Sequence, residues 1–194
     1  MTAAGLRVLV ADEDAAALDR LAGLLHQLGH TVCAYAVEVS EVAERIVEDD
    51  PEISIVVLHS DDDHALALIE EICAYASGPV IALTQEEDPD FIASAADRGI
   101  AAQAKPGDPD AVQSAIEVAL RRHAEIERLE AKVDQLEGAL ARRALIERAK
   151  GILMERHGVD DRTAFERLRT HARTERRRVV EVAYEVAEGE LELP

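Results

Sequence analysis

Polar side chains that could hold a cation and a phosphoryl group follow several short apolar runs in the N-terminal part of the chain. Asp12 and Glu13 come directly after the first run, Thr84 closes the fourth and Lys105 follows the fifth. Carboxylate oxygens suit Mg²⁺, and clustered carboxylates repel one another unless a cation or a lysine lies among them. A hydroxyl and an ammonium opposite them would suit a phosphoryl group. The pattern therefore predicts a Mg²⁺ and phosphoryl site if these runs end at one edge of a sheet.

Five apolar runs predict the strands that would position these side chains. They are Arg7–Ala11, Val32–Ala36, Ile53–Leu58, Val80–Leu83 and Ile100–Ala104. Apolar residues with helical spacing lie between the runs and after the last one. Alternating strands and helices predict an α/β doubly wound, mostly parallel sheet covered on both faces. Ligands bind at the carboxyl ends of the strands in such sheets, which is where the polar residues stand.

The first 121 residues resemble the receiver domain of bacterial response regulators, a flavodoxin-like fold. The resemblance rests on the run Val8-Leu9-Val10-Ala11-Asp12-Glu13, on Thr84 and Gly99, and on the pair Lys105-Pro106. It implies that the acidic pair binds Mg²⁺, that an Asp ending the third strand accepts phosphate from a sensor histidine kinase, and that the Thr and the Lys contact the phosphoryl group.

The third apolar run departs from the receiver pattern. It ends in His59, where the family has its phosphoacceptor, and Ser60, Asp61, Asp62 and Asp63 follow. Asp61 is the candidate acceptor if the strand extends further than the apolar run. The alternative is that the acidic residues cap the next helix and favour its N-terminal dipole. The residues around Asp12 would then form a vestigial pocket held by a salt bridge, with His59 as a partly buried structural residue.

Residues 122–140 predict a helical connector with an apolar seam. Ile126, Leu129, Val133, Leu136 and Leu140 follow alternating spacings of three and four, which is the a/d pattern of a coiled coil. We expect this helix to pair with a second copy, parallel or antiparallel, and to make the protein a homodimer. The alternative is one amphipathic helix that lies on its own chain.

The charge of the chain is divided between its two parts. The formal net charge is −19, with 40 acidic and 21 basic residues, and residues 1–120 contain 24 of the acidic and 5 of the basic ones. Residues 141–180 contain 12 basic and 6 acidic side chains, and all but one of the bases are arginines. Arginine grips phosphate bidentately and stacks on bases, so this segment is a candidate for nucleic-acid binding. The alternative is ordinary pairing with glutamates on helix surfaces.

Residues 141–194 predict a small three-helix unit. His157 and Gly158 end the first helix, Asp160 is the expected N-cap of the second and Thr174 of the third. Phe165 is expected in the core of this unit.

Residues 142–187 resemble the ANTAR domain, an RNA-binding antitermination module of bacterial regulators. The resemblance rests on the run from Arg143 to Met154, on Ala164-Phe165-Glu166-Arg167-Leu168-Arg169 and on Val182-Ala183. It implies binding to paired RNA stem-loops in nascent transcripts. The basic side chains that we expect to contact RNA are Arg148, Lys150, Arg169, Arg173, Arg176 and Arg177.

The remaining patterns narrow the class of protein. No Ser/His/Asp set, glycine-rich phosphate loop or Cys/His metal cluster appears, so we expect no enzymatic activity. No apolar run reaches the length of a membrane span. Cys33 and Cys73 lie among apolar residues and predict buried thiols in a reducing, cytoplasmic compartment. The rival interpretations are a protein-interaction adaptor and a DNA-binding response regulator.

Overall fold

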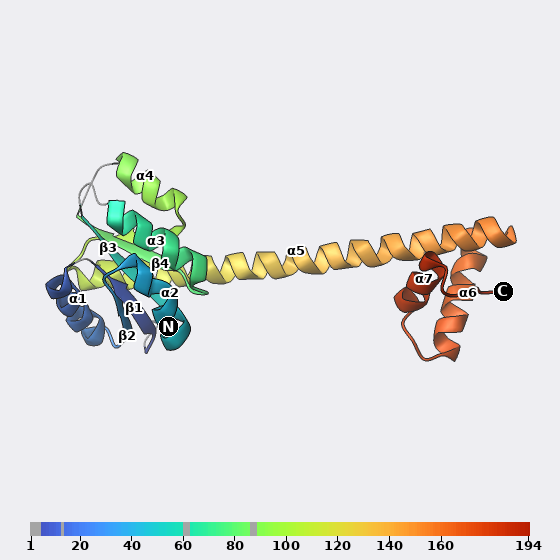
Figure 1. Ribbon diagram of the computed structural model, residues 1–194, viewed down its shortest axis with the longest axis horizontal. Helices are drawn as coiled ribbons and strands as arrows, with labels where there is room; N and C mark the ends of the chain where they lie inside the picture. Colours follow the sequence, from blue (N-terminus) through green and yellow to red (C-terminus); the bar gives the residue numbers. More distant parts are fainter. Residues whose placement is uncertain (1–4, 13, 60–62, 86–88) are drawn as a thin grey trace. The chain divides into compact units, whose positions relative to one another are not determined.

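A computed structural model describes residues 5–12, 14–59, 63–85 and 89–194 (Figure 1). The chain divides into two compact units, Met1–Glu127 and Arg128–Pro194. The division falls within the predicted connector. Glu13 and Asp61 lie outside the described residues.

The N-terminal unit contains the predicted parallel sheet. Its strands are β1 (Arg7–Ala11), β2 (Thr31–Ala36), β3 (Ile53–Leu58), β4 (Val80–Thr84) and β5 (Ile100–Ala104). They are parallel and lie in the order β2-β1-β3-β4-β5. Residues of β3 and β4 are buried throughout, as expected for central strands covered on both faces. The predicted fold class is confirmed.

Helices cover both faces of the sheet and create two apolar cores. One core contains residues from α2 (Val42–Asp49), α3 (Asp63–Tyr75) and α4 (Pro89–Asp97). The other contains residues from α1 (Ala15–Gln27) and from the first turns of α5 (Pro109–His157). Alternate residues of β1 contribute to different cores, because successive side chains of a strand point to opposite faces.

The C-terminal unit contains the end of α5 together with α6 (Asp161–Thr174) and α7 (Val179–Glu188). Small and branched aliphatic residues form its core, among them Ala149, Leu153, Leu168, Val182 and Val186. A helix of 49 residues, α5, is shared by both units. Among the described residues, no helix is both apolar enough and long enough to cross a membrane.

The helix ends of the C-terminal unit agree with the sequence at two points and differ at one. Helix α5 ends at His157, and Gly158 follows in the left-handed conformation with φ +60°. Asp160 caps α6 by accepting a hydrogen bond from the backbone N–H of Thr163 at 2.8 Å. The prediction that Thr174 caps the third helix is wrong. Thr174 ends α6, its hydroxyl donates to the carbonyl of Thr170, and Arg178 is the N-cap of α7.

Phe165 is not a core residue, contrary to the sequence-based expectation. Its side chain is 38% exposed, whereas Ala164, Leu168 and Ala172 are buried. These three repeat every fourth residue and face the core, while Phe165 lies one residue, or about 100°, away from that row. The core of this unit consists of aliphatic side chains, and the aromatic ring of Phe165 is not part of it.

Candidate functional sites: the strand-end pocket and the arginine surface

The carboxyl ends of the strands bring three of the predicted receiver residues to one edge of the sheet. Asp12 follows β1 with a buried side chain, Thr84 is the last residue of β4 and is also buried, and Lys105 follows β5 with an exposed side chain. Parallel strands end at the same edge, so the sheet supplies the arrangement that the sequence predicted. The edge unites residues that are up to 93 positions apart in the chain.

His59 contacts the buried carboxylate at this edge. Its Nε2 lies 3.0 Å from Oδ1 of Asp12, and the backbone N–H of Asp14 donates to the same oxygen at 2.9 Å. The other oxygen, Oδ2, is buried and has no hydrogen-bond partner among the described residues. The residue that follows β3 thus pairs with the buried acid that follows β1. The side chain of His59 is 45% exposed, and the rest of it is covered at this edge.

The predicted Mg²⁺ ligands fit a cation only in part. The buried Oδ2 of Asp12 is an oxygen that a cation could use, since a carboxylate oxygen without a partner is costly to bury. Within the described ranges, no three His, Cys, Asp or Glu side chains are grouped closely enough to hold a metal ion. Of the two protein ligands that the sequence suggests, Asp12 has an oxygen available for a cation, and Glu13 lies outside the described residues.

Three of the predicted RNA-contacting arginines are exposed around the end of α6. Arg169 and Arg173 are four residues apart and lie on one face of α6, and Arg176 follows in the turn before α7 with φ +56°. Within the part of the chain that the structure describes, no carboxylate pairs with any of these three guanidinium groups. We call Arg169, Arg173 and Arg176 the arginine surface.

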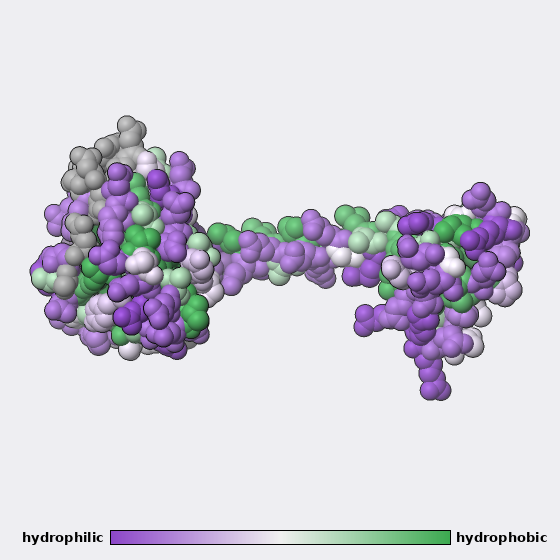
Figure 2. Space-filling view, in the orientation of Figure 1, coloured by the Kyte–Doolittle hydropathy of each residue, from purple (hydrophilic) through white to green (hydrophobic). Residues whose placement is uncertain are grey.

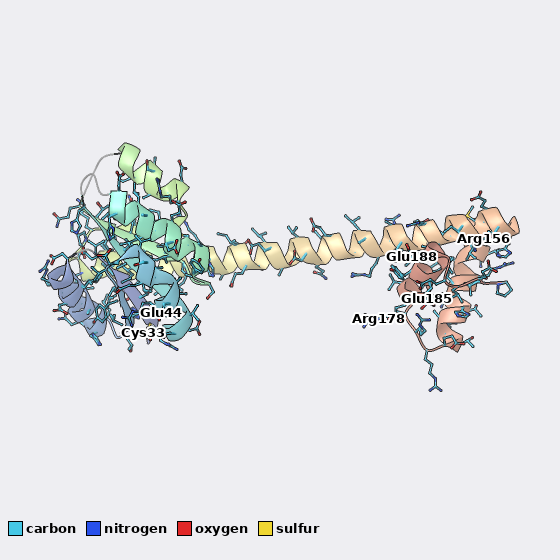
Figure 3. All side chains as sticks on the ribbon, viewed as in Figure 1. Cys33, Glu44, Arg156, Arg178, Glu185 and Glu188 are labelled. Atoms are coloured by element: carbon cyan, nitrogen blue, oxygen red, sulfur yellow. The ribbon has the colours of Figure 1, made fainter. Side chains whose placement is uncertain are left out.

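Two other arginines are engaged with acidic side chains. Nη1 of Arg177 donates to Glu185 at 2.9 Å, and its Nε lies 3.7 Å from Glu181. The pair lowers the pKa of the Glu185 carboxyl, mainly because Arg177 donates hydrogen bonds to the charged form. Arg148 lies 3.7 Å from Glu188. Figure 3 labels Glu185 and Glu188 in this unit. Both arginines would have to exchange these partners for phosphate.

Lys150 is buried between two helices, being only 7% exposed. Its ammonium lies 2.9 Å from Glu147 in the preceding turn of α5 and 2.5 Å from Asp161 at the start of α6. Hydrogen bonds to Asp161 and Glu147 raise the pKa of Lys150, so the ammonium stays charged well above neutral pH. This environment favours an ion pair that joins α5 to α6 over the direct RNA contact that the sequence suggested.

Replacing Lys150 tests this assignment. We expect Lys150→Met, which keeps the length of the side chain, to lower the midpoint of thermal unfolding of the full chain by a few degrees, because the link between α5 and α6 is lost. Circular dichroism measures the midpoint. The stabilisation belongs to the protonated lysine, so the difference from the unmodified protein should persist at neutral pH and disappear only in strong alkali. Arg143→Met, on an exposed side chain in the same helix, is the control.

Acid should weaken the pair between Arg177 and Glu185. The pKa of Glu185 is lowered in the folded state, so its contribution is complete above the ordinary carboxyl range of about 4 and is lost as the pH falls below it. We expect Glu185→Gln to unfold at a lower temperature than the unmodified chain at pH 7, and the gap between the two midpoints to narrow as the pH falls below about 4. Glu190→Gln, an exposed neighbour, should change neither value. A constant gap between pH 7 and pH 3 would contradict the assignment.

Comparisons with known proteins find similarities for both units. Residues 134–186 match the ANTAR domain family. The N-terminal part is similar to the signal receiver domain of a modulated diguanylate cyclase from Desulfovibrio desulfuricans G20, with 18% identity, a TM-score of 0.54 and coverage of 62% of this chain and 97% of that chain. It is also similar to a two-component response regulator of the LuxR family from Aurantimonas sp. SI85-9A1, with 19% identity and a TM-score of 0.54. The similarity covers 61% of this chain and 86% of that chain. A comparison with curated proteins finds no match.

The fold and the family match together describe the two units. The N-terminal unit has the receiver fold, and the C-terminal unit carries an ANTAR domain. A unit with the receiver fold is thus followed by residues that match the ANTAR domain family, which is the order that the sequence resemblances predicted. Both sequence resemblances are confirmed at this level.

Proposed function

We propose that this protein regulates transcription antitermination by binding paired RNA stem-loops through its ANTAR domain. The observation that carries the proposal is the arginine surface, three exposed guanidinium groups without acidic partners on the domain that matches the ANTAR family. Arginine binds phosphate bidentately and stacks on unpaired bases, and sequence-specific RNA recognition targets loops with such bases. The strongly acidic N-terminal unit would stay off the RNA.

Phe165 extends the proposed interface. It lies one helical turn before Arg169 on α6, so its exposed ring and that guanidinium group lie side by side on the helix surface. An aromatic ring beside a cation is a common platform for an unstacked base. We expected Phe165 in the core because its side chain is apolar. The strict four-residue spacing of Ala164, Leu168 and Ala172 is the signal that could have identified it as exposed.

The apolar seam of α5 supports a dimer in our proposal. Ile126, Leu129, Val133, Leu136 and Leu140 are between 49% and 65% exposed, and apolar residues are visible along this part of the helix in Figure 2. A repeated apolar stripe of this kind is normally covered. The occupant that fits it is a second copy of the same helix, because the stripe repeats with the period of a coiled coil.

The residue types along the seam favour a parallel pair of helices. With Ile126 and Val133 at the a positions and Leu129 and Leu136 at the d positions, the seam has the β-branched and leucine pattern that favours two parallel strands. Lys132 at g would also face Glu137 at e of the partner helix. Two ANTAR domains at the same end of the dimer would bind two linked hairpins, which increases avidity.

The receiver-fold unit is the proposed input. Phosphorylation by a sensor histidine kinase would require Asp61 as the acceptor, with Asp12 and Glu13 holding Mg²⁺ and with Thr84 and Lys105 at the phosphoryl group. His59 directly follows β3, and its Nε2 is within hydrogen-bond distance of Asp12. Mass spectrometry of the intact chain after incubation with acetyl phosphate and Mg²⁺ tests this route, with Asp61→Asn as the control.

A gel-shift experiment tests the proposed function. The full chain is titrated with an RNA that has two linked hairpins, with each hairpin alone and with duplex DNA of equal length. The proposal requires the tightest binding to the linked hairpins and a steep loss of affinity with added salt. Equal affinity for DNA would favour a DNA-binding regulator, and the absence of nucleic-acid binding would favour an interaction adaptor.

Replacing Phe165 with alanine should weaken RNA binding without unfolding the domain. Loss of one stacked base costs about 1–3 kcal/mol, or about 5- to 150-fold in affinity. The measurement is the gel shift with the linked hairpins, together with the thermal midpoint of the variant. Phe165→Trp keeps an aromatic surface and should restore binding. A loss of affinity in both variants would point to a packing role for the ring.

A further inference from the structure

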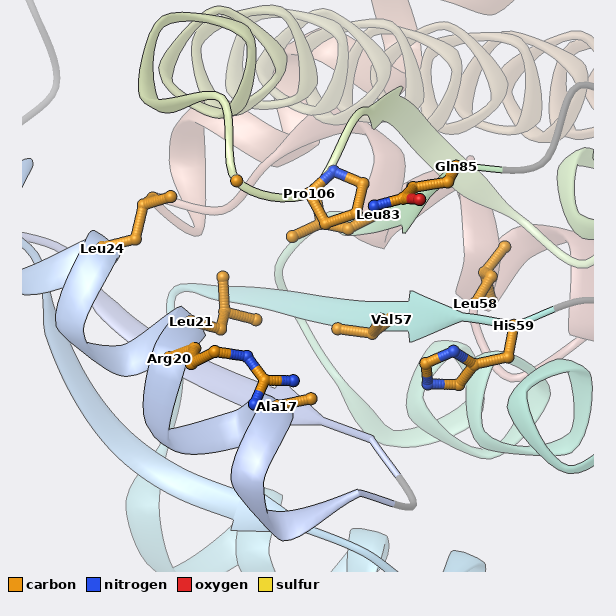
Figure 4. Close-up of a pocket in the computed structure, with 11 residues that line it drawn as sticks. Ala17, Arg20, Leu21, Leu24, Val57, Leu58, His59, Leu83, Gln85 and Pro106 are labelled. Atoms are coloured by element: carbon orange, nitrogen blue, oxygen red, sulfur yellow. The ribbon is translucent and has the colours of Figure 1, made fainter.

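A cavity lies in the receiver-fold unit beside α1 (Figure 4). It has a volume of about 530 Å³, which is within the range of small-molecule sites. Its walls are mostly apolar and include Leu21, Leu24, Val57, Leu83 and Pro106. These residues come from α1, from the ends of β3 and β4 and from the loop before α5, so the cavity depends on the complete fold.

The cavity lies where open α/β sheets bind their ligands. Helix α1 follows β1, and His59 follows β3, so the cavity is at the carboxyl edge beside the point where the strand order reverses between β1 and β3. The described residues of its lining do not include Asp12, Thr84 or Lys105. The cavity is therefore distinct from the predicted phosphoryl site, although His59 touches both.

The few polar groups of the cavity are donors that suit an anion. Figure 4 shows the guanidinium group of Arg20 extending past Ala17 on the side of the cavity where His59 lies. Gln85 adds an amide to the lining. Arg20 lies 3.6 Å from Asp14, and both side chains are more than half exposed. Such a surface pair is weak, so an anion in the cavity could replace Asp14 as the partner of Arg20.

We propose that this cavity binds a small amphiphilic anion, a molecule with a hydrocarbon body and one carboxylate or sulfonate group. The body would contact the leucines, Val57 and Pro106, and the anionic group would bind Arg20. The surrounding unit is strongly acidic and repels anions in general. Binding of an anion in the cavity would therefore depend on Arg20. A bound metabolite would then supply an input at the sheet edge where His59 replaces the usual phosphoacceptor.

Two fluorescent probes test the proposal on the full chain. 1-Anilinonaphthalene-8-sulfonate is an amphiphilic anion, and N-phenyl-1-naphthylamine has the same aromatic rings without the sulfonate. We expect saturable binding of the anion at one site per chain, and Arg20→Gln should weaken it at least about tenfold while the neutral probe is unaffected. Octanoate should displace the anionic probe, and octylamine, a cation of similar length, should not.

Further variants separate the cavity from general surface binding. Ala17→Leu adds bulk inside the cavity and should weaken both probes, whereas Ala16→Leu, on the exposed side of the same helix, and Arg45→Gln on α2 should change neither. Arg20 is exposed, so the test with Arg20→Gln stands even if Ala17→Leu unfolds. Binding that is not saturable, that is equal in Arg20→Gln, or that octylamine displaces as well as octanoate would overturn the proposal. None of these measurements involves RNA, so they are independent of the proposed function.

Discussion

Replacing Arg169 and Arg173 together with alanine should weaken binding to the linked hairpins by at least about 100-fold. Charge-assisted hydrogen bonds contribute about 1.5–3 kcal/mol each, and neither guanidinium group has an acidic partner in the described part of the free protein to compensate for the loss. The salt dependence should also become shallower, by about one unit of slope on a logarithmic plot for each phosphate contact removed. Gel shifts at several salt concentrations give both values.

A matched control removes the same charge from the other unit. Arg45→Ala combined with Arg121→Ala takes two exposed arginines from the N-terminal unit and leaves the arginine surface intact. Its affinity and salt slope should equal those of the unmodified chain. An equal loss in both double variants would mean that net charge alone drives binding. No loss in either would remove the arginine surface from the interface, and the thermal midpoint shows whether each variant is folded.

Placing aspartate in the middle of the seam should convert the dimer into a monomer. Val133→Asp combined with Leu136→Asp would put four carboxylates into the paired helices, two from each chain, where like charges repel in an apolar environment. Sedimentation equilibrium measures the mass. Binding to the linked hairpins should fall toward the affinity for a single hairpin, which corresponds to a loss of about 10²- to 10⁴-fold in avidity.

The control for the seam uses the opposite side of the same helix. Ala131→Asp combined with Gln135→Asp adds the same number of aspartates to α5 at positions outside the a/d stripe, and its loss of helix propensity is at least as large because alanine is the best helix former. This variant should remain a dimer. A monomeric control would mean that aspartate simply weakens α5, and a dimeric seam variant would mean that the two copies meet on another surface.

The sequence was sufficient for most of the fold. Three strands have the predicted bounds, and the other two differ by one residue, because each is a short apolar run between polar or helical segments. Gly158 and Asp160 mark the turn between α5 and α6 since helix caps depend on local backbone geometry. The error at Thr174 has a local cause as well. A threonine can end a helix by bonding back to the carbonyl of residue 170, and the sequence does not distinguish that from a cap.

Side-chain environments in the C-terminal unit were predicted less well. Arg148, Lys150 and Arg177 have the same formal charge as the members of the arginine surface, and nothing in their sequence neighbourhood separates the two groups. The partner of Lys150 at the start of α6 is eleven residues away, and that of Arg177 lies two turns along α7. These pairs depend on how the helices pack, so pattern alone could not identify which bases are free to meet phosphate.

The sequence by itself determined the receiver-type sheet, the ANTAR domain and the apolar seam, because periodicity and motif runs are local properties of the chain. Only the tertiary structure decided that His59 contacts Asp12, that Lys150 links two helices and that a cavity lies beside Arg20. Each of these depends on residues brought together from distant or differently oriented elements. Their energies come from burial and from charge pairing, which exist only after the strands and helices have packed.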